Sequence, residues 1–327
     1  MPEARPCSFI DTQEGLSLLL QELAGEPALA LDTESNSFHA YYEKVCLLQL
    51  STRVADYVLD PFLVDVRPLG PLLADPAREV VLHAADYDIR SLKRDFGFLF
   101  GRLFDTMLAA KLLGRSEVGL AALVRDQFGV RLAKEHQRSD WGRRPLSPDQ
   151  VAYAYRDTRY LLPLRDLLAA ELQQQGKVAQ ARGLFDRQAS CKPRPKRFDE
   201  EGFRHIRGFK ALDAPSRAVA RALYLVREER ARAADRPPFK IFGEDALLEL
   251  ARCRPQTCGA LSGIKGLGSS TVRRDGEAIV GAIVHALEPA TARSWTSQWS
   301  QKEAPAAAAG SEAPVGSAAP GADQSAR

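Results

Sequence analysis

The chain has 327 residues, 45% of them hydrophobic and 27% charged, which is the composition of an ordinary globular protein and a length typical of two domains. No apolar run reaches the roughly 18 residues that a membrane-spanning helix needs, and the first residues lack the apolar core of a signal peptide, so we expect a cytoplasmic protein with no membrane partner. A net charge of +3 is too small to establish a nucleic-acid partner by itself, and five scattered cysteines indicate free thiols.

Residues 1–190 alternate between patterns typical of strands and patterns typical of helices. The segment TQEGLSLLLQELAG has helical spacing and ends at a glycine. The expected strands are short and apolar, and they lie at 28–35, 44–52, 55–62, at the start of 79–97 and at the start of 101–114. Helices dominate from there to about residue 180. Strands followed by helices that pack on them predict a mixed α/β layer.

The pattern changes near residue 191, where CKPRPKRFDEE combines two prolines with several charges and indicates a linker, which we place at 191–207. Between 208 and 288 the apolar residues recur at helical spacing without a strand signal, which predicts a small all-helical domain. From about residue 300 the chain consists mainly of Ala, Pro, Gly and Ser. This composition predicts a disordered tail, which we place at 289–327.

Two acids stand at the end of the strand expected at 28–35. Asp32 and Glu34 are two residues apart, so both side chains point to the same face of a strand. Neighbouring carboxylates repel, and a divalent cation is the usual partner that offsets the repulsion. A solvated strand end is the alternative, and this pair alone does not decide between the two.

Further polar residues occur where a metal site would need them. Asp86 and Asp88 follow a buried strand at the start of a helix, and Tyr153 and Asp157 are four residues apart on a helix, hence on one face. Each has a structural alternative. An acid in the first turn is favoured by the helix dipole, and the tyrosine and aspartate could form a structural hydrogen bond.

Together these residues resemble the tyrosine-bearing branch of the DEDD exonucleases, and residues near them resemble ribonuclease D. The matching pieces, in chain order, are Asp32-x-Glu34, Asp88 with Ile89 and Leu92, FDT at 104–106, SDWGRRPLSPDQ at 139–150 and Tyr153-x3-Asp157. The helical region at 208–288 resembles the HRDC domain that follows the nuclease in ribonuclease D. The resemblance implies a ribonuclease H-like domain with a mixed sheet over 1–190, followed by an HRDC-like helical domain.

The resemblance also implies a chemistry, in which two divalent ions, Mg²⁺ or Mn²⁺, activate water and stabilise the leaving oxygen of a phosphodiester. Asp32 would bridge the ions, Glu34 and Asp157 would complete the shell of the first, and Asp88 would hold the second. Tyr153 would aim the attacking water, because an unmodified tyrosine is too weak a base at pH 7.

The activity implied is that of a 3′–5′ exoribonuclease, which trims RNA 3′ ends and releases nucleoside 5′-monophosphates, with tRNA precursors as one candidate substrate. The alternatives are the same chemistry on single-stranded DNA, and a non-catalytic nucleic-acid-binding module. The sequence does not choose RNA over DNA, because reading the 2′-hydroxyl depends on the geometry of the groove. No obligate protein partner is evident from the sequence.

Three polar residues close to these motifs receive other roles. Asp88 is preferred to Asp86 as the ligand, because only Asp88 is followed by the hydrophobic pattern of the family. His83 is predicted to be a satisfied histidine at the end of a strand rather than a ligand. Asp105 is predicted to cap the helix that follows it.

Five basic residues are candidates for nucleic-acid contact. Arg143 and Arg144 lie in a polar loop before the Tyr153 helix, and Lys265, Arg273 and Arg274 lie in or just after the glycine-rich turn GIKGLG. Glycines in a turn let backbone N–H groups meet a phosphate beside a helix N-terminus. A solvated loop and a turn that serves packing alone are the alternatives. The turn lacks the Gly-Lys-Ser/Thr of a P-loop.

Overall fold

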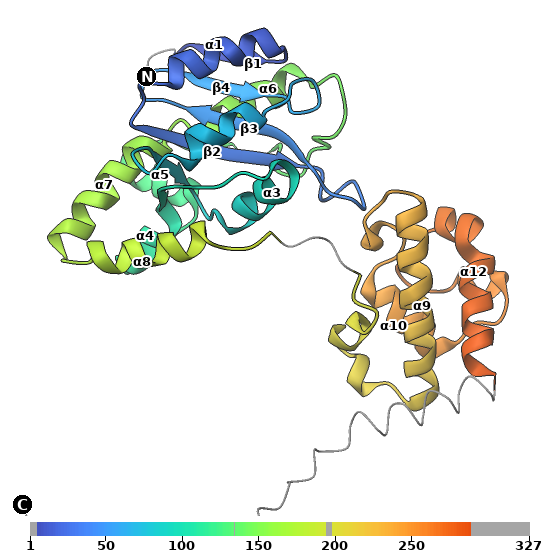
Figure 1. The fold of residues 1–327 in the computed structure, drawn as a ribbon. Coiled ribbons are helices and arrows are strands. Elements are labelled where there is room, and N and C mark those ends of the chain that lie inside the picture. Colours follow the sequence, from blue (N-terminus) through green and yellow to red (C-terminus); the bar gives the residue numbers. More distant parts are fainter. Residues whose placement is uncertain (1–4, 134, 194–197, 289–327) are drawn as a thin grey trace, which may run out of the picture. The chain divides into compact units, whose positions relative to one another are not determined.

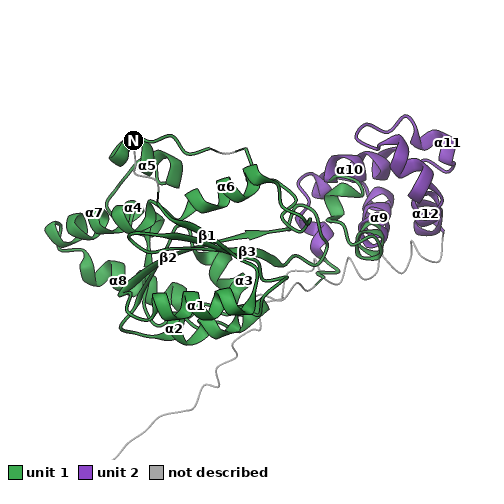
Figure 2. Ribbon diagram, turned by 90° about the horizontal axis from the view of Figure 1, so that it is seen from above, with its two compact units in different colours: residues 1–201, 227–243 green, residues 202–226, 244–327 purple. Residues whose placement is uncertain are grey.

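The computed structural model describes residues 5–133, 135–193 and 198–288 (Figure 1). Two compact units are distinguished in Figure 2, residues 1–201 with 227–243, and residues 202–226 with 244–327. The tail predicted at 289–327 lies outside the described residues, as do four residues of the predicted linker, 194–197. Among the described helices, none combines the length and the apolar character that crossing a membrane requires.

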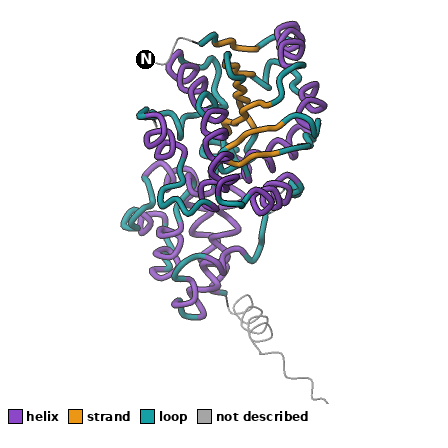
Figure 3. The backbone as a smooth tube through the Cα atoms, turned by 90° about the vertical axis from the view of Figure 1, so that its left-hand side faces the viewer, coloured by secondary structure: helices purple, strands orange, loops and turns teal. Residues whose placement is uncertain are grey.

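The first unit is built on one six-stranded mixed sheet, as the alternating pattern predicted. Its strands in spatial order are β1 (Cys7–Ile10), β4 (Asp56–Leu59), β3 (Val45–Ser51), β2 (Ala28–Ser35), β5 (Glu79–Leu82) and β6 (Leu103–Asp105). β3 runs antiparallel to both of its neighbours, whereas β1 pairs with β4, β2 with β5, and β5 with β6 in parallel. Helices lie on both sides of this sheet (Figure 3).

The strands differ from the sequence prediction at one edge and at one end. β1 was not among the expected strands, because it has four residues and only Ile10 is buried. β4 stops at Leu59 instead of reaching residue 62. The cause is Asp60, which begins a turn in which its carboxylate accepts the N–H of Phe62 at 3.0 Å.

Eight α-helices of the described chain belong to this unit. They are α1 (Gln13–Leu23), α2 (Gly70–Ala74), α3 (Asp86–Phe96), α4 (Thr106–Leu112), α5 (Leu120–Phe128), α6 (Pro148–Asp157), α7 (Leu161–Gln174) and α8 (Val178–Ala189). In Figure 2, α1, α2 and α3 lie below the sheet and α6 lies above it. The main core therefore forms between sheet and helices, and a smaller cluster under α6 contains Leu47, Val58 and Trp141.

The described residues of the second unit form helices joined by turns and contain no strand, as predicted. It contains α10 (Glu244–Cys253), α11 (Cys258–Leu261) and α12 (Ser269–Leu287), and α9 (Ala214–Ala233) begins in it. Apolar side chains at helical spacing, such as Leu247, Leu250, Ile279 and Ile283, are fully buried. Gly266 has a φ of +83°, a conformation that favours glycine in the turn before α12.

Candidate active site

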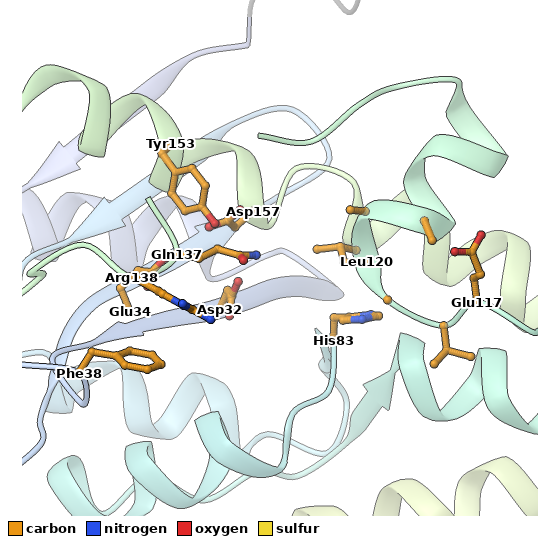
Figure 4. Close-up of a pocket in the computed structure, with 14 residues that line it drawn as sticks. Asp32, Glu34, Phe38, His83, Glu117, Leu120, Gln137, Arg138, Tyr153 and Asp157 are labelled. Carbon is orange, nitrogen blue, oxygen red and sulfur yellow. The ribbon is translucent and has the colours of Figure 1, made fainter. Parts of the chain in front are cut away.

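Strand β2 brings Asp32 and Glu34 to one face of the sheet, as their spacing predicts. In the antiparallel pairing of β2 with β3, Asp32 lies opposite Gln49 and Glu34 lies opposite Leu47. Because side chains alternate along a strand, both carboxylates point to the same face. Both side chains line a cavity of about 760 Å³, whose lining residues are drawn as sticks in Figure 4. The end of β2 is therefore the floor of an open site.

Helix α6 brings Tyr153 and Asp157 to the same cavity (Figure 4). A capping box starts this helix, in which the Ser147 hydroxyl accepts the N–H of Gln150 and the Gln150 side chain accepts the N–H of Ser147. The ring of Tyr153 is buried beside Trp141, with the two ring centres 6.0 Å apart. The phenol is thus held by packing, and its hydroxyl points towards Asp157.

The structure separates the two aspartates at the start of α3. Asp88 is buried, and its carboxylate accepts a hydrogen bond from the hydroxyl of Thr33, the residue between the two acids of β2. Asp86 is exposed and forms an ion pair with Arg90 at 2.9 Å on the outer face of the helix. Of the two, Asp88 therefore contacts β2, and Asp86 pairs with Arg90 of its own helix.

Asp105 is the cap of α4, as predicted, and it also holds the turn before α3. In its fully buried carboxylate, Oδ1 accepts the N–H groups of Met107, Leu108 and Ala84, and Oδ2 accepts that of Ala85. Ala84 has a φ of +56°, which costs energy for a residue with a Cβ. Asp105 therefore stabilises the turn from which Asp88 enters the site.

The four acids share an environment that disfavours negative charge. Burial raises the pKa of Asp32 to about 7, with a further contribution from the charge of Asp157. Burial also raises the pKa of Asp157 to about 7. The pKa of Glu34 rises to about 10 through burial and then through its acidic neighbours, and that of Asp88 lies well above its usual range for the same two reasons. This arrangement favours a cation or protons.

An all-carboxylate set of oxygen donors fits Mg²⁺ or Mn²⁺ and suits softer metals poorly. Within the described ranges, however, no three His, Cys, Asp or Glu side chains are spaced to hold an ion as they stand. One reason is visible at Asp88, whose carboxylate is hydrogen-bonded to Thr33. The four acids therefore fit a divalent cation through their oxygen donors and through the repulsion that a cation would relieve. Their side chains are not already arranged around an ion position.

Several residues that line the cavity were missed by sequence reasoning. Phe38 follows the acids of β2, and the guanidinium of Arg138 lies 5.8 Å from the centre of its ring. The side chain of Gln137 lies beside the hydroxyl of Tyr153 and lines the cavity with it. The opposite wall is the segment from Glu117 to Ala122, which includes the start of α5. No signal in the sequence marks these residues, because their position on the cavity wall depends on how distant segments pack.

The paired arginines before α6 have different environments, which corrects the expectation for Arg144. Its guanidinium forms an ion pair with the buried Asp60, donates to the backbone oxygens of Cys46 and Trp141, and covers the ring of Phe62 at 4.9 Å. Those contacts use its hydrogen-bonding groups inside the protein. Arg143 is exposed. Of the two arginines, Arg143 is the one whose side chain is exposed and could contact a phosphate.

We expect Arg144→Met to lower the free energy of unfolding by about 3 kcal/mol, because it leaves the carboxylate of Asp60 buried without its charge partner. Arg143→Met is the matched control and should change the free energy by less than about 0.5 kcal/mol. Urea unfolding of both variants checks this. Equal, small effects would show that Arg144 is not needed for the fold.

Arg274 also has a partner within the protein, since it forms an ion pair at 2.8 Å with Asp275, which is 4% exposed. Lys265 is exposed on the turn before α12, and Arg273 is exposed on the second turn of that helix. Of the three basic residues predicted in this region, these two are the better placed to meet solvent anions.

Two family models match the chain. The first is described as a 3′–5′ exonuclease and covers residues 7–173, which include all four acids and Tyr153. The second is the HRDC domain, which covers residues 216–283.

Similar proteins and structures agree with these matches. The chain is 32% identical to ribonuclease D of Gluconacetobacter diazotrophicus over 85% of its length and 71% of the relative's. It is 30% identical to the RRP6-like 2 protein of Arabidopsis thaliana, covering 88% of this chain but only 34% of that protein. Escherichia coli RNase D superposes with a TM-score of 0.67 at 30% identity, covering 86% of this chain and 75% of that one. The catalytic core of Trypanosoma brucei RRP6 superposes with a TM-score of 0.79 at 28% identity, covering 88% and 81%.

Proposed function

The chain belongs to the ribonuclease D family of 3′–5′ exonucleases, and from this premise we propose that its hydrolysis of RNA 3′ ends depends on divalent cations held by Asp32, Glu34, Asp88 and Asp157. The observation that carries the proposal is the placement of Asp32, Glu34 and Asp157 on the wall of one cavity, with the buried Asp88 hydrogen-bonded to Thr33 between the two acids of β2. The pKa values of all four carboxyls are raised. Bound cations would supply the charge that activates water and stabilises the leaving 3′ oxygen.

We assign the remaining chemistry to the chain's own residues. The pKa of Tyr153 is raised by burial and then by the neighbouring acids, so its phenol keeps its proton and serves as a hydrogen-bonding group. Gln137 and the packing of Trp141 orient the phenol towards the position of the attacking water. Phe38, which lines the cavity, offers a ring on which a base stacks.

The proposed substrates are RNA 3′ ends, and the proposed products are nucleoside 5′-monophosphates. Precursors of tRNA are one candidate, and the related E. coli enzyme is described as an exoribonuclease involved in structured RNA processing. The test uses 5′-labelled RNA and DNA of matched sequence with Mg²⁺, with Mn²⁺ and with EDTA. A ladder that shortens from the 3′ end of RNA only when metal is present supports the proposal. Equal cleavage in EDTA contradicts it.

We also propose that the HRDC-like region contacts phosphates through Lys265 and Arg273. Changing both to Ala should make the plot of log affinity for single-stranded RNA against log salt shallower by about 1.4, because each neutralised phosphate contributes about 0.7. Lys210→Ala with Arg252→Ala is the control, since both side chains are exposed and the change of net charge is the same. An unchanged slope in the first variant would remove this contact from the proposal.

A further inference from the structure

His83 follows strand β5 and lines the cavity on the far side of Asp32 from Tyr153 (Figure 4). Its Nδ1 lies 2.8 Å from the hydroxyl oxygen of Thr106. That hydroxyl donates its single proton to the backbone oxygen of Leu82 at 3.1 Å, so its oxygen accepts from His83. Nδ1 therefore carries the hydrogen.

The other ring nitrogen of His83 is consequently a hydrogen-bond acceptor. Burial lowers the pKa of the ring to about 4, so the imidazole is neutral at pH 7 and has only one N–H. Among the residues that the structure describes, none forms a hydrogen bond with Nε2. The prediction that His83 has a hydrogen-bond partner within the protein therefore holds for Nδ1. Nε2 keeps a lone pair that can accept a hydrogen bond, and His83 lines the cavity.

A ligand group that meets this nitrogen must donate a hydrogen bond. The scissile phosphodiester is ionised and has only acceptor oxygens, so it cannot donate a hydrogen bond to Nε2. The sugar of the terminal nucleotide carries hydroxyl donors whatever the base, and it lies next to the scissile phosphate. Its 3′-hydroxyl is common to RNA and DNA, whereas the 2′-hydroxyl is present only in RNA. A single acceptor fixed on the cavity wall is therefore suited to select the sugar.

Building on the proposed function, we propose that Nε2 of His83 accepts a hydrogen bond from the 2′-hydroxyl of the 3′-terminal nucleotide and makes the enzyme prefer ribose ends. His83 is then a specificity-determining residue. A neutral hydrogen bond of this kind corresponds to a rate preference of about 3- to 10-fold.

The experiment compares three RNA strands that differ only in the terminal sugar, which is ribose, 2′-deoxyribose or 2′-fluororibose. Single-turnover cleavage by the wild-type protein should be about 3- to 10-fold faster for ribose than for both others, because hydrogen and fluorine do not donate. In His83→Phe the ratio between ribose and deoxyribose should fall close to 1, whereas a purely structural defect would slow all three substrates alike. His83→Gln, whose amide oxygen accepts, should recover part of the preference.

Nitrogen-15 NMR of the wild-type protein tests the same inference without a mutation, and it should show the proton on Nδ1. The proposal is overturned if the proton is on Nε2, if wild-type cleavage ignores the terminal 2′ group, or if folded His83→Phe keeps the full ratio. It is also overturned if removing the 3′-hydroxyl, and not the 2′-hydroxyl, slows cleavage by the wild-type protein and this difference disappears in His83→Phe. Failure to cleave any strand would instead contradict the proposed function.

Discussion

Asp32→Asn is expected to abolish cleavage while the protein stays folded, and to raise its stability when no metal is present. The rate should fall by more than about 10³-fold, since losing even an outer partner of a metal ligand typically costs about 10- to 100-fold. Stability should rise because the half-buried carboxylate of Asp32 is disfavoured by desolvation and then by the charge of Asp157, and Asn has nearly the same shape without the charge.

The direction of the pH dependence follows from the raised pKa. The carboxyl of Asp32 has an ordinary pKa of 3.8 and a pKa of about 7 in the folded, metal-free protein, so the folded state holds the proton more tightly than the unfolded state. Between about pH 4 and pH 7 the stability of the wild-type protein therefore falls as pH rises, by up to about 1.4 kcal/mol for each pKa unit. The advantage of Asn should be small at pH 4 and full at pH 8.

Thermal melting in EDTA at pH 5 and pH 8, and again with Mn²⁺, measures these effects. Mn²⁺ should raise the melting temperature of the wild-type protein, because binding to the folded state adds stability, and it should raise that of Asp32→Asn far less. Asp86→Asn is the matched control, as Asp86 is an exposed acid on the outer face of α3. Near-wild-type turnover of Asp32→Asn, or a lower melting temperature in EDTA at pH 8, would contradict the assignment.

Tyr153→Phe is expected to lower the rate constant for cleavage by about 10²- to 10⁴-fold, with little change in affinity for Mn²⁺ or RNA. The phenol keeps its proton, so its contribution is the orientation of water and not the removal of a proton. Phe retains the ring that packs beside Trp141, so the melting temperature should also stay close to that of the wild-type protein. The rate should show no inflection near the ordinary pKa of tyrosine.

Asp157→Asn, one turn further along α6, should have a different effect. It removes a negative ligand, so the Mn²⁺ concentration for half-maximal rate should rise, whereas Tyr153→Phe should leave it unchanged. If the tyrosine and aspartate served only to hold the helix, each substitution would cost about 0.5–1.5 kcal/mol of stability and leave the folded fraction active. A Tyr153→Phe variant that melts early but cleaves normally would therefore exclude the catalytic role.

The positions of the central acids could be predicted from the sequence because local geometry sets them. Two residues along a strand, or four along a helix, bring side chains to one face whatever the rest of the chain does. The same holds for Asp105, whose side chain caps the helix that begins at the next residue. The helical second unit follows likewise from periodicity. These features depend on neighbours in the chain.

Spacing within the chain does not distinguish equivalent neighbours. The resemblance favoured Asp88 over Asp86, which the structure supports, but nothing in the sequence separated Arg144 from Arg143. Asp86 and Asp88 both stand in the first turn of α3, and only packing against Thr33 of β2 makes one of them buried. Arg143 and Arg144 are adjacent and alike, yet the partner of Arg144 is Asp60, which is 84 residues away in the chain. Such contacts depend on how the sheet and the loops meet, which local pattern does not determine.

The sequence by itself determined the mixed α/β unit and the helical unit, because these follow from periodicity. Spacing placed Asp32 with Glu34 and Tyr153 with Asp157, and the resemblance to the DEDD exonucleases joined these pairs with Asp88 into one set. Only the tertiary structure decided the walls of the cavity, which come from segments near residues 38, 83, 120 and 138. It also decided which nitrogen of His83 is an acceptor, because that depends on the single proton of the Thr106 hydroxyl and on the backbone oxygen to which it is given. Hydrogen bonds between distant segments form only once the fold has brought their atoms within reach.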